Sequence, residues 1–150
     1  MGLIKDDRQL AITRRTLAEL NEAVRKIRAK YRGAAYRAIS SGPLGMIGDL
    51  EQEIREYRWL RTTTPAKVMR KYPIVRMDDV GPFLARLRIA SGLTQVDVAR
   101  KVGCKQPDIV RLEDADYRAH SARTLKAVAE ALGVEIVIGA RKAPRPKRVG

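Results

Sequence analysis

Between residues 78 and 133 the sequence holds four short amphipathic segments, each about ten residues long. Residues that commonly cap the first turn of a helix precede three of them: Asp78 or Asp79, Thr94 and Ser121. Glycines that commonly end a helix follow three of them: Gly92, Gly103 and Gly133. Because helices this short are unstable alone, they must pack against one another. The pattern predicts a mainly α fold with a helical domain over residues 78–140.

The second and third of these segments form the most specific pattern in the chain. Gly103 lies between them and predicts a tight turn, and the small side chain of Ala99 lets the two helices approach closely. The apolar residues that would fix their crossing angle are Val102, Ile109 and Leu112. Two helices joined in this way leave the outer face of the second one free to enter a major groove of DNA.

From Phe83 to Ile138 the sequence resembles the phage-repressor and Cro-like helix-turn-helix family, also called the xenobiotic-response-element regulators. The residues that carry the resemblance are Leu93-Thr94-Gln95, Ala99, Gly103, Gln106, Ile109, Glu113 and the segment from Leu125 to Val134. Four consecutive elements in register make it more specific than a two-helix pattern alone. It implies a lambda-repressor-like helix-turn-helix domain whose second motif helix reads bases.

The resemblance implies DNA-binding roles for five residues. Gln95, at the start of the first motif helix, is expected to bind a phosphate together with the amide groups there. Gln106 stands where the family reads bases and could pair with adenine, and Arg111 could reach guanine or a phosphate. Asp108 lies between them and could accept a hydrogen bond from N4 of cytosine. Lys105 replaces the capping Ser or Thr that the family favours, so a phosphate contact is expected in place of the cap.

Two further features of this region bear on structure and on the branch of the family. Arg88 and Glu113 match a charge pair that ties the first helix to the third in related repressors, so we expect them to be structural. After Glu113, the run Asp114-Ala115-Asp116-Tyr117 replaces the common Asn-Gly. This variant is closer to regulators related to the antitoxins of toxin–antitoxin pairs.

Residues 1–61 carry two stripes of apolar residues with the 3-4 spacing of a coiled-coil seam. The first stripe is Leu10, Leu17, Leu20, Val24, Ile27 and Tyr31, and the second is Ile47, Leu50, Ile54 and Tyr57. Gly33 and the run from Ser40 to Pro43 separate them and are expected to break the helix. We therefore predict an N-terminal antiparallel helical hairpin. It could serve dimerisation, bind a toxin protein, or simply pack on the rest of the chain.

The remaining segments are expected to lack helices. Residues 62–77 are predicted to be a linker, because Pro65 disfavours a helical conformation at the residue before it. The β-branched run from Val134 to Ile138 predicts a short C-terminal strand, which could form a dimer contact. Residues 141–150 are rich in basic residues and proline and are predicted to be a disordered tail. That tail could be inert or could lie along DNA phosphates.

Composition limits the functions that remain. The chain has 31 Lys and Arg against 17 Asp and Glu, a net charge of +14 that attracts polyanions. A single cysteine, Cys104, and a single histidine, His120, exclude an internal disulfide and a Cys/His zinc site. No glycine-rich phosphate loop or catalytic constellation is evident, so we expect neither an enzyme nor a cofactor. Without a long apolar run or a signal peptide, a cytoplasmic protein without membrane contact is expected.

The sequence thus favours a DNA-binding transcriptional repressor that acts as a homodimer on double-stranded DNA. Its two half-sites are expected about 34 Å apart on a two-fold symmetric operator. An antitoxin that neutralises a partner protein and autoregulates its operon is the main alternative. An RNA-binding or coactivator adaptor built on the same domain is a third.

Overall fold

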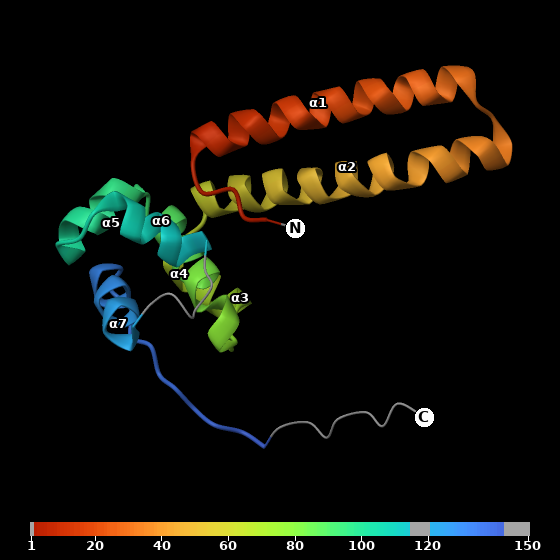
Figure 1. Ribbon diagram of the computed structural model, residues 1–150. Coiled ribbons are helices and arrows are strands. Elements are labelled where there is room, and N and C mark those ends of the chain that lie inside the picture. The colour runs from red at the N-terminus through yellow and green to blue at the C-terminus, as the bar shows by residue number, and fades with distance from the viewer. Residues whose placement is uncertain (1, 115–120, 143–150) are drawn as a thin grey trace.

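The computed structural model describes residues 2–114 and 121–142, and every regular element within them is helical (Figure 1). The elements are α1 (Asp7–Lys30), α2 (Gly33–Thr62), α3 (Pro65–Lys71), the 3-10 helix η1 (Met77–Asp79), α4 (Val80–Ala90), α5 (Gln95–Val102), α6 (Gln106–Asp114) and α7 (Ala122–Ala131). The antiparallel helices α1 and α2 form a long arm (residues 7–62), and the shorter helices gather at its base. The predicted helical fold with an N-terminal helical pair is confirmed.

The predicted apolar seam holds the two helices of the arm together. On α2 the seam residues Ile47, Ile54 and Tyr57 are buried, whereas the seam residues of α1 are only half-buried. Two helices cover only one side of each other, so most of the arm surface faces solvent. None of the described helices, the two long ones included, is long and apolar enough to cross a membrane.

The expected break at residues 40–43 is wrong, because α2 runs without interruption from Gly33 to Thr62. The seam continues through this stretch: Ser40 lies seven residues before Ile47, is buried, and donates its hydroxyl to the carbonyl of Tyr36 at 2.7 Å. Pro43 lacks one backbone N–H, but packing along the seam outweighs the lost hydrogen bond. The chain reverses earlier, just before Gly33, whose φ of +54° suits glycine.

The expected linker over residues 62–77 contains a helix. Thr64 caps α3 by accepting a hydrogen bond from the backbone N–H of Lys67 at 3.4 Å. Pro65 lies in the first turn, where its missing N–H costs no hydrogen bond. Val68 on this helix is fully buried in the core. Only residues 63–64 and 72–76 of the expected linker therefore lack helical structure.

One apolar core joins the base of the arm to the helical domain. Its fully or nearly fully buried members come from α2 to α7: Tyr57, Leu60, Val68, Leu84, Leu87, Val98, Ile109, Leu112 and Val128. Ile4, from the segment before α1, is buried in the same core. The arm is therefore fixed at its base to the helices that carry the predicted DNA-reading motif.

The predicted strand from Val134 to Ile138 is absent from the described part of the chain, where these residues are extended without regular pairing. A strand needs a second extended segment to satisfy its backbone groups. None of the described residues forms a backbone hydrogen bond with residues 135–138. Arg141 and Lys142 also lack regular structure. The rest of the predicted basic tail, residues 143–150, lies outside the described residues.

Leu60→Ala tests whether the end of α2 belongs to the common core. Leu60 is fully buried, so we expect a loss of about 2–5 kcal/mol in the free energy of unfolding, measured with urea. Leu44→Ala on the same helix is the control, because Leu44 is 45% exposed. Equal unfolding free energies for the two variants would contradict a core shared between arm and domain.

Candidate nucleic-acid interface

The first helix of the motif, α5, begins with a reciprocal cap that fixes its first turn. Thr94 Oγ1 accepts a hydrogen bond from the backbone N–H of Asp97 at 3.1 Å, and Asp97 Oδ2 accepts one from the backbone N–H of Thr94 at 2.8 Å. Hydrogen bonds from the Thr94 side chain and backbone lower the pKa of the Asp97 carboxyl. The helix ends at Gly103, whose φ of +78° turns the chain into α6.

At the start of the second helix of the motif, α6, Asp108 makes the reciprocal half of a capping box. Asp108 Oδ2 accepts a hydrogen bond from the backbone N–H of Lys105 at 3.1 Å. Its other oxygen pairs with Arg111 on the next turn. Lys105, Gln106 and Arg111 are exposed, while the opposite side of the helix buries Ile109, Leu112 and Glu113 in the domain. The outer side of the helix is therefore polar and exposed to solvent, and its inner side is packed against the rest of the domain.

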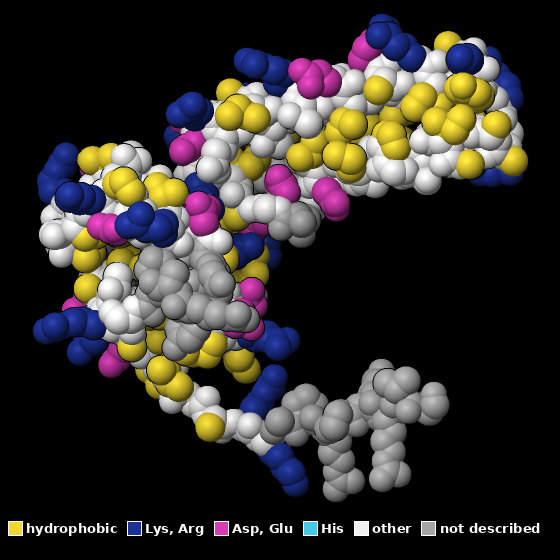
Figure 2. Space-filling model, in the orientation of Figure 1, with side chains coloured by type: hydrophobic (Ala, Val, Ile, Leu, Met, Phe, Trp, Pro, Cys, Tyr) yellow, Lys and Arg dark blue, Asp and Glu magenta, His cyan; other side chains and the backbone are white. Residues whose placement is uncertain are grey.

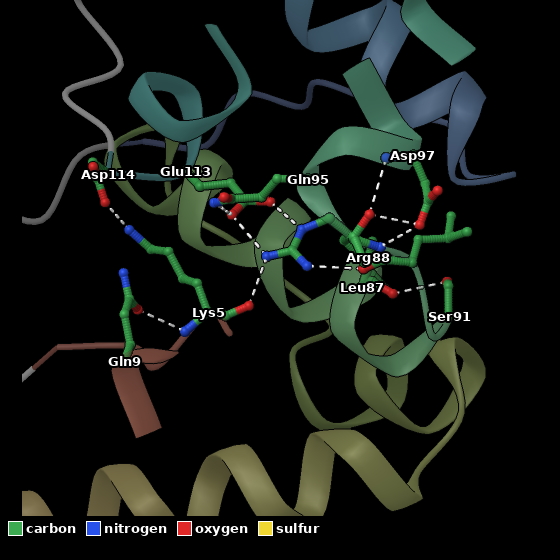
Figure 3. Close-up of polar contacts among 11 residues, drawn as sticks. Lys5, Gln9, Leu87, Arg88, Ser91, Gln95, Asp97, Glu113 and Asp114 are labelled. Atoms are coloured by element: carbon green, nitrogen blue, oxygen red, sulfur yellow. Dashed lines mark hydrogen bonds and ion pairs between the residues drawn. The ribbon is translucent and has the colours of Figure 1, made fainter. Parts of the chain in front are cut away.

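A buried ion pair holds α6 against the first helix of the domain, α4 (Figure 3). Arg88 donates from Nε and Nη2 to the two oxygens of Glu113, the second at 2.9 Å, and from Nη1 to the carbonyl of Leu93 at 2.9 Å. Gln95 Nε2 donates to Glu113 Oε2 at 2.8 Å. These contacts confirm the expected structural role of Arg88 and Glu113. They fix α4, α5 and α6 at one point.

The segment before α1 extends this network to the arm, which sequence reasoning missed. Arg88 Nη2 also donates to the carbonyl of Lys5 at 3.1 Å, and Lys5 Nζ pairs with Asp114 at the end of α6. Burial lowers the pKa of the Lys5 ammonium; Glu113 opposes this shift and Arg88 adds to it. The only sequence signal was the apolar pair Leu3-Ile4 before the first helical pattern.

The predicted site residues occupy two different environments. Gln95 is 8% exposed, and its amide points into the buried network rather than to solvent. Gln106 is exposed, yet both glutamines line one shallow cleft, which Asp7 and Arg61 at the base of the arm also line. Arg61 Nη1 donates to Asp7 Oδ1 at 3.1 Å, so an ion pair lies at this edge of the cleft. The arm therefore borders the surface that the sequence assigned to DNA.

Comparison with known families places a helix-turn-helix domain at residues 79–137. No curated protein and no solved structure matched the chain. The matched residues include η1 in part, α4 to α7 and most of the extended run that follows. The chain therefore contains a helix-turn-helix domain, which implies DNA binding and is typical of non-enzymatic transcriptional regulators.

Glu113→Ala tests the buried network. The change leaves the Arg88 guanidinium buried without its partner, so we expect a loss of about 3–5 kcal/mol in unfolding free energy. The double variant Arg88→Met, Glu113→Leu should recover a large part of that loss. Glu130→Ala, at an exposed position on α7, is the control. A Glu113→Ala variant as stable as this control would contradict a supporting role for the pair.

Asp97→Asn tests the cap of α5 through its pH dependence. The pKa of Asp97 is lower in the folded than in the unfolded chain, so the folded state binds fewer protons. The stabilisation is therefore present at neutral pH and disappears as pH falls through the lowered pKa. The melting temperature of Asp97→Asn should be below that of wild type at neutral pH and approach it in acid. A difference in melting temperature between Asp97→Asn and wild type that stays constant with pH would be the contradictory result.

Proposed function

We propose that the chain is a sequence-specific DNA-binding repressor of the phage-repressor and Cro-like branch, acting in the cytoplasm without a cofactor. The observation that carries this proposal is the placement of α6. Its start presents Lys105 and Gln106 to solvent, and its end is locked by Glu113 inside the domain. Base reading needs side chains on a rigidly supported helix, and this arrangement provides one.

Each polar residue of α6 then has a distinct role at the DNA. Gln106 donates to and accepts from one adenine edge, and Lys105 neutralises a neighbouring phosphate. Arg111 is paired with Asp108 in the free protein, so a guanine contact requires Arg111 to exchange that carboxylate for the base. Asp108, once released, accepts from N4 of a neighbouring cytosine. This exchange makes binding selective for the DNA sequence. At a DNA site without a suitable base, Arg111 stays paired with Asp108 and makes no contact with the base.

The proposed phosphate contact at Gln95 uses its backbone rather than its side chain. The side-chain amide is engaged with Glu113, whereas the backbone N–H groups of Gln95 and Val96, in the first turn of α5, have no helical carbonyl to bind. A phosphate at this helix end would accept from them and meet the positive end of the helix dipole. The net charge of +14 supplies the long-range attraction to double-stranded DNA. Two copies related by a two-fold axis would read the two halves of an operator.

A second function, that of an antitoxin that binds a partner protein, is favoured by the arm. Ile12, Ile39, Leu44 and Met46 are exposed large apolar residues on it. Residues 23–48, at its far end, contain six basic and no acidic residues, and Figure 2 shows Lys and Arg gathered there. A toxin bound at this end would therefore need an apolar surface with an acidic rim. Co-purification of such a partner with the full chain would support this function.

Selection of bound sequences from a random duplex pool, at physiological salt, tests the main proposal. We expect enrichment of an inverted repeat, and about 100-fold weaker binding of that repeat by the double variant Gln106→Ala, Arg111→Ala. The matched control is Gln52→Ala, Arg55→Ala, which removes the same residue types from the arm. Binding by the α6 variant as tight as by this control would contradict the assignment of α6. Salt-sensitive binding without any enriched sequence would contradict sequence-specific repression.

A further inference from the structure

The extended segment, residues 134–142, has the chemistry of a strand but no strand to pair with. Gly133, with a φ of +72°, ends α7, and the N–H of Val134 bonds the carbonyl of Ala129 at 3.0 Å. Beyond it, no backbone hydrogen bond joins residues 135–142 to the rest of the described chain. Val137 and Ile138 are 82% and 74% exposed. Such a row of free amide and carbonyl groups beside β-branched side chains is a template for another strand.

The extended segment borders an apolar groove on the helical domain. Val134, Ile136 and Ile138 line it, together with Met77, Val80 and Leu125 from η1, α4 and α7. Glu135 also lines this groove, and Val137 lines a second groove beside Tyr72 and Val75. Figure 2 shows hydrophobic side chains exposed where the chain leaves α7. In a regular strand alternate side chains share a face, so Val134, Ile136 and Ile138 would form one apolar face of the extended segment.

We propose that the extended segments of two copies of the chain pair as an antiparallel two-stranded ribbon centred on Ile138. This inference rests on the proposed homodimer and names its interface. In this register each residue opposes the one equally distant on the other side of residue 138. Ile136 then faces Ala140 of the second copy, and the two Ile138 side chains face each other over the grooves. Each copy supplies the strand that the other lacks. One two-fold contact therefore gives the backbone amide and carbonyl groups of both segments hydrogen-bond partners.

Charge complementarity selects this register among the possible ones. Glu135 is the single acidic residue of the extended segment, and Arg141 lies six residues later on the same face. Centring the ribbon on Ile138 places Glu135 directly opposite Arg141 of the second copy, twice by symmetry. Gly139 then opposes Val137 and leaves room for its branched side chain. A shift by one residue would move the apolar side chains to the solvent face.

Cysteine cross-linking of the full chain tests the register, with Cys104 replaced by serine. Ile138→Cys opposes itself, with Cα atoms about 4.5–5.5 Å apart, within disulfide range. Val137→Cys is the matched control: it is equally exposed, but its copies lie two residues out of register, beyond about 7 Å. We expect a rapid covalent dimer for Ile138→Cys and little for Val137→Cys. Equal rates, or a faster Val137→Cys, would overturn the register.

Charge reversal tests the interface by sedimentation equilibrium without DNA. Glu135→Arg and Arg141→Glu should each weaken self-association about tenfold, and the double reversal should restore it. Both side chains are exposed, so we expect the variants to keep the wild-type fold. A monomeric wild-type chain, or a dimer indifferent to both reversals, would overturn the ribbon even if DNA binding is intact. A ribbon dimer that fails to enrich any DNA sequence would instead overturn the proposed function alone.

Discussion

The ion pair between Arg88 and Glu113 determines where α6 lies, and the candidate interface depends on it. A buried guanidinium and a buried carboxylate each require hydrogen bonds in fixed directions, so they tolerate little displacement. Arg88 satisfies this requirement with Glu113, with the carbonyl of Leu93 between α4 and α5, and with the carbonyl of Lys5. Three segments far apart in the sequence, around Lys5, Arg88 to Leu93 and Glu113, therefore meet at one guanidinium. Moving α6 would break several of these contacts together.

The same network gives the arm a defined position beside α6. Lys5 pairs with Asp114 at the end of α6. The first helix of the arm, α1, begins only two residues after Lys5. At the other end of the arm base, Leu60 is buried in the core that α4, α6 and α7 share. A partner that binds the arm would therefore act on a body that is rigidly joined to α6. This coupling is compatible with either proposed function, because a repressor and an antitoxin both link binding events to DNA.

Local patterns in the sequence predicted the elements that depend on neighbouring residues. Caps at Thr94 and Ser121, the turn at Gly103 and the seam of the arm are all set within one or two helical turns. The break expected before Ile47 failed because seam packing along a long helix outweighed one proline. The inward turn of Gln95 and the contact of Lys5 with Asp114 depend on tertiary placement, which no local spacing encodes. The strand from Val134 failed for a different reason, because pairing needs a partner that the described chain does not contain.

We propose that the starts of α5 and α6 form the DNA-binding surface, on a scaffold held by Arg88 and Glu113. Amide hydrogen exchange of the full chain, with and without a selected duplex at physiological salt, tests it most directly. We expect slower exchange at residues 94–97 and 105–111 when DNA is bound, since a phosphate and base edges would cover them. Protection confined to the arm or to α7, with unchanged exchange in those two stretches, would contradict it.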